Sequence, residues 1–133
     1  MIADTSAWVE FLRGTGSFAH RRLAAALHAH EPVWVTDVIF QEVLQGARDA
    51  AHFLRLERAL GRLPSFRAAS TRDLSRDAAL LYARCRWQGV TIRNPNDCLI
   101  AMAALVSGLP LLAHDRDFSA IVKIEPRLQL LVP

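Results

Sequence analysis

Four short apolar runs constrain the fold that this chain can adopt. They cover residues 1–3, 33–35, 110–113 and 128–132, and the segments between them carry apolar residues at helical spacing. Apolar runs this short, without polar alternation, are typical of parallel strands that are buried on both faces. The sequence therefore predicts an α/β fold, with a small parallel sheet of about four to five strands and helices on both faces.

Cap residues, glycines and prolines mark the ends of the expected helices. One helix lies between Ser6 and Gly14, and others cover about residues 19–30, 37–48, 50–63, 71–88 and 95–107. The expected N-terminal caps are Thr5 or Ser6, Thr36, Thr71 and Asn94. Residues 90–92 fit either a short strand or an extended loop, and no element is assigned to residues 116–127. The length fits one domain with a single core, residues 1–133.

The composition favours a folded protein with a basic surface. Hydrophobic residues make up 52% of the chain, which argues against disorder. There are 15 arginines but only one lysine, and the formal net charge is +3. Such a surface suits a polyanionic partner, although the base composition of the genome explains an arginine bias equally well.

The sequence also indicates where the protein resides. Cys85 and Cys98 do not form a disulfide framework and fit buried thiols in a reducing compartment. Asp4 directly follows three apolar residues, so we expect no signal peptide. The longest uncharged run, residues 98–114, contains Gly108 and Pro110 and is too short to span a membrane. We expect a cytoplasmic protein without membrane association.

Four acidic residues lie beside apolar segments, where an isolated charge is costly. Asp4 ends the first apolar run, Asp115 follows the third, Asp97 opens a helix, and Glu42 interrupts an apolar helical stripe. Parallel strands end at one edge of a sheet, and a helix that leads into such a strand begins at that edge. The four carboxylates are therefore expected to converge there.

A shared divalent cation is the simplest partner for these carboxylates. Clustered acids without a cation would repel one another, and Mg²⁺ prefers hard oxygen ligands. Divalent ions can activate water and stabilise charge during phosphodiester hydrolysis. Taken singly, Asp4 fits a helix cap, Asp97 a favourable charge at a helix start, and Asp115 and Asp117 turn residues. The joint placement favours a metal site.

A few other side chains have two interpretations each. Four arginines near the expected edge fit either phosphate contacts or solvated surface: Arg13, Arg86, Arg93 and Arg116. Trp8 and Trp34 fit core packing better than stacking on bases, because their neighbours are apolar. His114 is the only histidine near the expected site.

Four blocks of residues surround these acids. They are Ile2-Ala3-Asp4-Thr5-Ser6-Ala7-Trp8, residues 36–46 with Glu42, Asp97-Cys98-Leu99-Ile100-Ala101, and residues 110–118 with Asp115 and Asp117. In order and spacing, these blocks resemble those of PIN-domain ribonucleases, and within them the VapC-type toxins of bacterial toxin–antitoxin pairs. The resemblance covers essentially the whole chain.

This resemblance implies a function and a set of roles. Asp4, Glu42, Asp97 and Asp115 would hold Mg²⁺ or Mn²⁺ with the help of Asp117, and Ser6 would orient a carboxylate or a bound water. The implied reaction is endonucleolytic cleavage of RNA by metal-activated water. A homodimer is implied, together with a cognate antitoxin that inserts a segment into the acidic groove, where an arginine would pair with the carboxylates. Many relatives have a hydroxyl residue near Ala113, so one supporting contact is expected to be missing here.

Other functions fit the same features. A DNA-directed or repair nuclease would use the same site, because nothing in the sequence reveals recognition of a ribose 2′-hydroxyl. An inactive RNA-binding scaffold fits less well, since all four acids are present. Phosphatases of the haloacid dehalogenase type need Asp-x-Asp after the first strand, where this chain has Asp4-Thr5-Ser6. A phosphoacceptor receiver domain needs a mid-chain acceptor aspartate and a late lysine, and Lys123 alone does not suffice.

Overall fold

The computed structural model describes all residues from Met1 to Pro133 and contains seven helices and three strands. The strands are β1 (Ile2–Ala3), β2 (Leu111–Leu112) and β3 (Leu130–Leu131). The helices are α1 (Thr5–Arg13), α2 (Phe18–His28), α3 (Asp37–Gln45), α4 (Ala50–Gly61), α5 (Thr71–Trp87), α6 (Asn96–Ser107) and α7 (Arg116–Ile124). None of these helices is long and apolar enough to cross a membrane.

The sheet is parallel, as the apolar runs predict, with the strand order β1-β2-β3. Two further segments extend it through single parallel bridges, Trp34 with Ile2 and Ser65 with Val35. The predicted strand at residues 33–35 therefore forms bridges only. The fifth segment is the one at Ser65, whereas residues 90–92 form a loop. The α/β class is confirmed, with shorter regular strands than expected.

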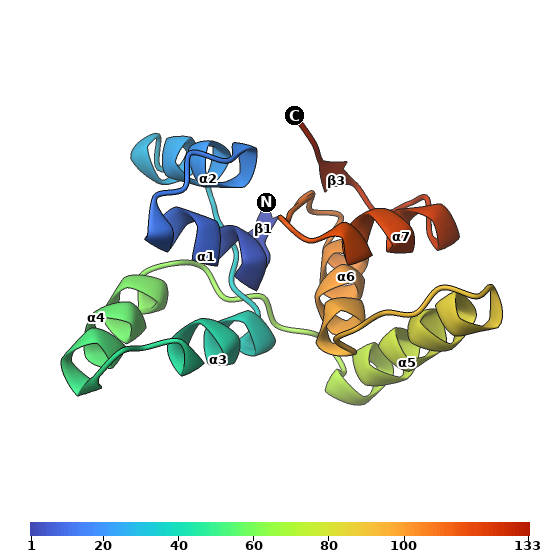
Figure 1. Cartoon of the computed structure of the whole chain (residues 1–133). Coiled ribbons are helices and arrows are strands. Elements are labelled where there is room, and N and C mark those ends of the chain that lie inside the picture. Colours follow the sequence, from blue (N-terminus) through green and yellow to red (C-terminus); the bar gives the residue numbers. More distant parts are fainter.

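The helices cover the strands from two sides. In Figure 1, helices α1 to α4 lie on one side of the N-terminal strand and α5 to α7 on the other. Contacts agree with this division, because α1 packs on α2 and α3, α5 packs on α6 and α7, and α3 meets α6 across the middle. The two halves of the chain therefore meet at the sheet.

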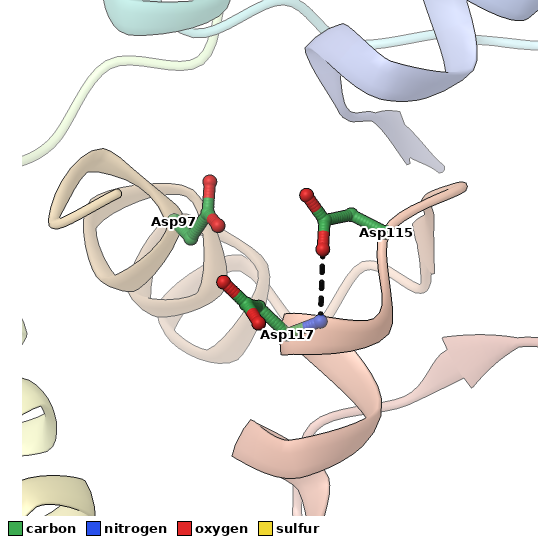
Figure 2. Close-up of side chains that lie close together, drawn as sticks. All are labelled: Asp97, Asp115 and Asp117. Carbon is green, nitrogen blue, oxygen red and sulfur yellow. Dashed lines mark hydrogen bonds between the residues drawn. The ribbon is translucent and has the colours of Figure 1, made fainter. Parts of the chain in front are cut away.

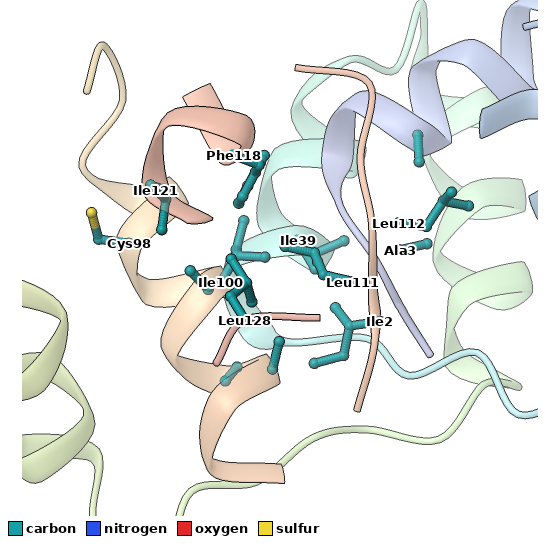
Figure 3. Packing of buried hydrophobic residues seen from close by; sticks show 14 of the residues in the cluster. Ile2, Ala3, Ile39, Cys98, Ile100, Leu111, Leu112, Phe118, Ile121 and Leu128 are labelled. Atoms are coloured by element: carbon teal, nitrogen blue, oxygen red, sulfur yellow. The ribbon is translucent and has the colours of Figure 1, made fainter. Parts of the chain in front are cut away.

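The core lies around the central strands. Figure 3 shows Ile2 and Leu111 beside Ile39 of α3, Ile100 of α6 and Phe118 of α7. All five side chains are fully buried. Burial of each such side chain stabilises the fold by about 1.5–3 kcal/mol. This packing fixes the carboxyl ends of β1 and β2, where the acidic residues follow.

Several predicted caps differ by a residue or two. Asp4 caps α1 through a bond from the Ser6 N–H, whereas the expected caps were Thr5 or Ser6. Ser70 caps α5, whereas the expected cap was Thr71. In each case the residue just before the helix accepts a hydrogen bond from a free N–H of the first turn. A residue that is already part of the helix is not placed to accept this bond. The prediction for Thr36 is confirmed.

Helix α7 is the element that the sequence prediction missed. Asp115 caps it, and Phe118, Ile121 and Ile124 form its buried face. Their spacing of three residues is the helical signal, which charged neighbours at Arg116 and Asp117 obscured. The helix matters for the site because its first turn carries Asp117.

The tryptophans and cysteines belong to the interior. Trp8 is buried and packs edge-on against Phe11, with ring centroids 6.0 Å apart, and Trp34 is partly buried against the core. Core packing of both rings is confirmed. Cys85 and Cys98 are free, buried thiols, and burial raises the pKa of Cys98 to about 12.

Candidate metal centre

A pocket of about 510 Å³ opens at the carboxyl ends of β1 and β2. It is lined by Asp4, Glu42, Asp97, Asp115 and Asp117, together with Ser6. The pocket has only one hydrophobic lining residue, Val9. All five acids considered for the site thus face one cavity. They come from both halves of the chain, as the parallel topology predicts.

Asp4 is buried, and only one of its two carboxylate oxygens accepts hydrogen bonds. Its Oδ2 accepts bonds from the Ser6 N–H at 2.9 Å and the Ser6 hydroxyl at 2.5 Å. Its Oδ1 is buried without any hydrogen-bond partner. Burial raises the pKa of Asp4 to about 6, against the bonds from Ser6, which lower it. A buried oxygen without a donor is costly, so this atom fits a ligand that the protein does not itself supply.

Three aspartates form the tightest group in the pocket. Asp97, Asp115 and Asp117 each offer a carboxylate oxygen, and these oxygens lie within 4.8 Å of one another. Figure 2 shows Asp97 on α6 facing the start of α7, where the other two carboxylates lie. Asp117, considered only an assisting residue from sequence, is one of the three.

Asp97 carries the largest electrostatic strain at the site. It is the second residue of α6 and is 6% exposed. Burial, and then the charges of Asp4, Asp115, Asp117 and Glu42, together raise its pKa to about 7. No hydrogen bond of the protein reaches its carboxylate, whereas the bonds in this region go to Asp115 and Asp117. A divalent cation would remove both causes, because it replaces lost hydration and offsets the repulsion.

Arg93 forms ion pairs with Asp115 and Asp117. Its Nη2 donates to Asp115 Oδ1 at 2.7 Å, and its Nε donates to Asp117 Oδ2 at 3.1 Å. The backbone N–H of Arg93 also donates to Asp117 Oδ2, at 3.0 Å. The Asp117 N–H donates to Asp115 Oδ1 at 2.9 Å, and Figure 2 marks this bond. On each carboxylate these bonds go to a single oxygen.

Glu42 lies on the other side of the pocket, on α3. Its Oε1 accepts from the Thr5 hydroxyl at 2.8 Å, and its Oε2 accepts from the Asn94 side-chain amide at 3.1 Å. Both of its oxygens are therefore held by the protein. Glu42 is not part of the three-carboxylate group. Its contacts fix the start of α1 and the start of α6 relative to α3.

The donor set fits a hard divalent cation. Asp4 leaves Oδ1 open, Asp115 leaves Oδ2 open, Asp117 leaves Oδ1 open, and Asp97 accepts no bond. Several carboxylate oxygens without histidine or cysteine are the ligands that Mg²⁺ and Mn²⁺ prefer. The residues present therefore fit the metal that the sequence implied.

Ser6 connects the two strands at this edge. Its hydroxyl donates to Asp4 and accepts from the His114 N–H at 2.8 Å. Asp4 follows β1 and His114 follows β2, so Ser6 fixes the two strand ends relative to each other. The His114 ring lies at the pocket wall, with its Nε2 3.8 Å from Glu10 Oε2.

Comparison with known proteins places the chain in a family. The model of the PIN domain family matches residues 1–124. The chain belongs to the PIN domain family. It is 39% identical over 127 residues to VapC ribonuclease Mb1587 of Mycobacterium bovis and, to the same extent, to ribonuclease VapC11 of Mycobacterium tuberculosis. These matches cover 93% of this chain and 92% of each relative.

Solved structures show that the fold of this PIN domain is shared. One match is a chain of VapBC2 from Rickettsia felis bound to a DNA fragment from their promoter, with a TM-score of 0.71, 19% identity and coverage of 98% and 96%. Another is a chain of FitAcB from Neisseria gonorrhoeae, with a TM-score of 0.69, 20% identity and coverage of 99% and 96%. The small sheet with helices on both faces is therefore the arrangement of these proteins too.

Three pocket residues of this PIN domain had another or no role in the sequence analysis. Thr5 was expected to be a cap and instead donates to Glu42. Asn94 was expected to be a cap, and its amide reaches Glu42 while its carbonyl oxygen accepts from Asn96. Arg93 was expected near phosphates and binds two aspartates. The clue was position, since Arg93 and Asn94 precede Asp97 at the same helix start.

The other arginines considered for phosphate contacts do not line the acidic pocket. Arg13 lines a neighbouring groove that also touches Glu42. Arg86 and Arg116 are exposed at the end of α5 and the start of α7. Ala113 is partly buried against the core and supplies no polar atom to the pocket.

Proposed function

We propose that this PIN domain is a metal-dependent endoribonuclease and acts as the toxin of a toxin–antitoxin pair. The observation that carries the proposal is the set of open carboxylate oxygens. Asp4 has a buried oxygen without a donor, beside three aspartates whose ligand atoms lie within 4.8 Å of one another. Such a cluster is stable when a cation is present and costly when it is absent.

The relatives support RNA as the substrate. Proteins 39% identical over nearly the full length are named ribonucleases. At that similarity the backbone around the site is expected to be retained, and all four predicted acids are present. The single-domain organisation of residues 1–133 and a cytoplasmic location are part of the same proposal.

The residues of the chain would divide the work as follows. Asp4, Asp97, Asp115 and Asp117 would hold Mg²⁺ or Mn²⁺ through their open oxygens. When bound, the metal would supply activation of a water and stabilisation of charge on the phosphate. Ser6 fixes Asp4 through two bonds, so that its free oxygen stays directed into the pocket. Glu42, already held by Thr5 and Asn94, would act on bound water rather than as the main ligand.

An antitoxin and a second copy of the chain are the proposed protein partners. The structure of VapBC2 supports the first, because a chain of the same fold occurs there. Arg93 supports it further, since its ion pairs demonstrate that these carboxylates accept a guanidinium. An arginine from an antitoxin segment would bind the same kind of site and exclude metal or substrate. Homodimerisation is testable by light scattering of the purified chain.

The test is nuclease activity with matched variants. Purified protein is incubated with RNA or single-stranded DNA in Mg²⁺, in Mn²⁺ or in EDTA. We expect cleavage of RNA only with metal, and loss of at least about 100-fold in Asp97→Asn, because a ligand is removed. Asp73→Asn is the control, since Asp73 is also in the first turn of a helix but is exposed and outside the pocket.

Two outcomes would change the proposal. Equal cleavage of single-stranded DNA would favour the repair-nuclease alternative. Metal-independent cleavage, or full activity in Asp97→Asn, would contradict the proposed mechanism. In cells, expression of the wild-type chain is expected to inhibit growth, and Asp4→Ala or Asp97→Ala is expected to relieve the inhibition.

A further inference from the structure

Arg93 bridges two of the three carboxylates in the tight group. Its Nη2 lies 2.7 Å from Asp115 Oδ1, and its Nε lies 3.1 Å from Asp117 Oδ2. No other arginine and no lysine lines the acidic pocket, where the only other contact of this kind is between His114 and Glu10. The five acids of the site therefore have one arginine beside them, which pairs with two of them. Without it, the facing charges of Asp115 and Asp117 would repel each other.

The guanidinium of Arg93 is exposed and can move into solvent, whereas the backbone of Arg93 is held by a hydrogen bond to Asp117. The Arg93 side chain is 56% exposed, while that of Asp117 is 9% exposed. Two further bonds do not involve the guanidinium, since the Arg93 backbone N–H donates to Asp117 Oδ2 and the Asp117 N–H donates to Asp115 Oδ1. Both carboxylates would thus keep their positions after the side chain has moved away.

We infer that Arg93 is a built-in counter-ion that competes with the divalent cation for Asp115 and Asp117. This inference rests on the proposed function, because it concerns the same metal centre. A guanidinium and a divalent cation on neighbouring oxygens of the same carboxylates repel each other. The guanidinium therefore stabilises the metal-free state and weakens metal binding. Arg93 acts through the two aspartates and is a positioning residue.

The opposite role has a different consequence. If Arg93 served only to align Asp115 and Asp117 for the metal, its removal would weaken binding, because the ligands would lose their orientation. The two backbone bonds argue for the competing role, since they already provide orientation. The sign of the change in metal affinity separates the two roles.

The experiment measures Mn²⁺ binding to the full chain by electron paramagnetic resonance of free Mn²⁺, and Mg²⁺ binding by calorimetry. Arg93→Gln removes the charge and keeps hydrogen-bond donors, and Arg93→Ala removes both. We expect both variants to bind Mn²⁺ about tenfold more tightly than wild type. Arg116→Ala is the matched control, because Arg116 is adjacent to Asp115 in sequence but is exposed and forms no ion pair. Its affinity is expected to stay within about twofold of wild type.

Thermal unfolding in EDTA and in Mn²⁺ gives a second readout that does not depend on activity. The rise in Tm caused by Mn²⁺ is expected to be larger for Arg93→Gln than for wild type. Binding by wild type with no gain, or with a loss, in both variants overturns the role of Arg93 alone. Absence of Mn²⁺ binding by wild type and by both variants overturns the metal centre and this role together. If Arg93→Ala does not fold, Arg93→Gln decides.

Discussion

At the scale of single residues, three aspartates of the site are each fixed through one oxygen. Asp4 is held by Ser6, and Asp115 and Asp117 are held by Arg93 and by backbone N–H groups. The remaining oxygens of these groups are open. Asp4, expected as a helix cap or a site residue, and Asp115, expected as a turn residue or a site residue, each cap a helix and face the pocket. One oxygen caps the helix and the other faces the pocket.

Ser6 is the residue whose loss would best test this arrangement. In Ser6→Ala, Asp4 Oδ2 keeps only the backbone bond, and the His114 N–H loses its acceptor. We expect RNA cleavage to fall about tenfold, since partners that orient ligands are typically worth 10–100-fold. Stability is expected to fall by about 1–2 kcal/mol. The measurements are kcat/KM for an RNA substrate and urea unfolding.

Ser17→Ala is the matched control for that prediction. Ser17 caps α2 through a bond to the His20 N–H and lies outside the acidic pocket. Its loss is expected to cost about 1 kcal/mol of stability and to leave cleavage unchanged. A parallel loss of activity in both variants would indicate that stability, rather than orientation of Asp4, explains the effect of Ser6.

At the scale of elements, helix ends position the site. Helices α1, α6 and α7 all begin at the acidic pocket, and each carries an acid at its cap or in its first turn. The positive ends of three helix dipoles thus face one cluster of carboxylates. Helix α3 adds Glu42 from its second turn, and the bonds from Thr5 and Asn94 connect it to the others.

The turn between α6 and β2 is expected to be sensitive to substitution. Gly108 ends α6 with a φ of 67°, in the left-handed region that residues with a Cβ disfavour. Gly108→Ala should therefore cost about 1 kcal/mol, measured by urea unfolding. Gly61→Ala is the control, because Gly61 is the last residue of α4, has no positive φ, and has open space where a Cβ would lie.

The control should be neutral or slightly stabilising, by up to about 1 kcal/mol, because alanine restricts the unfolded chain. Equal losses in both variants would contradict the assignment of strain to Gly108.

At the scale of the whole molecule, the site exists only because the two halves of the chain meet. Asp4 and Glu42 come from the first half, and Asp97, Asp115 and Asp117 come from the second. Burial of Ile2 and Leu111 in one core holds the halves together. The hydrophobic energy of the core thus offsets the repulsion among the acids. Because this repulsion grows as the acids lose their protons, the stability of the metal-free protein depends on pH.

We predict that the metal-free protein is most stable at about pH 4. Burial raises the pKa of Asp4 to about 6 and that of Asp97 to about 7, from 3.8. The contribution of these two groups to the free energy of unfolding is complete below pH 3.8. It is lost as the pH rises through about 6 for Asp4 and about 7 for Asp97. Bonds from Arg127, and then Arg84, lower the pKa of Glu125 to about 2, from 4.5, so its contribution is present above 4.5 and is lost as the pH falls toward 2.

Urea unfolding in EDTA at several pH values checks this prediction. From pH 5 to 8 we expect a loss on the order of 2 kcal/mol, after allowance for solvent screening. Mg²⁺ should reduce the loss, because it binds the deprotonated carboxylates. Asp97→Asn should also reduce it, since one of the two groups can no longer titrate. Greater stability of the wild type at pH 8 than at pH 5 in EDTA would contradict the prediction.

The sequence alone determined much of this protein. Apolar runs at residues 1–3 and 110–113 predicted buried parallel strands, because only such strands need consecutive apolar residues. Acids directly after those runs predicted an acidic edge, because parallel strands end together. Helix α7 was missed, since a short amphipathic segment with charged first-turn residues resembles a loop. Cap positions shifted by one or two residues because aspartate, serine and threonine are all preferred caps, so the sequence does not show which of several neighbours lies just outside the helix.

Only the tertiary structure decided which carboxylate oxygens of the site lack a hydrogen-bond donor. Packing brings together side chains that are far apart in sequence. Thr5 and Asn94 meet Glu42, and Arg93 meets Asp115 and Asp117. No local pattern encodes these distances. The sequence determined that carboxylates gather at one edge. The packed halves determined which oxygens the protein satisfies and which it leaves for a cation, because hydrogen bonding and desolvation depend on three-dimensional neighbours.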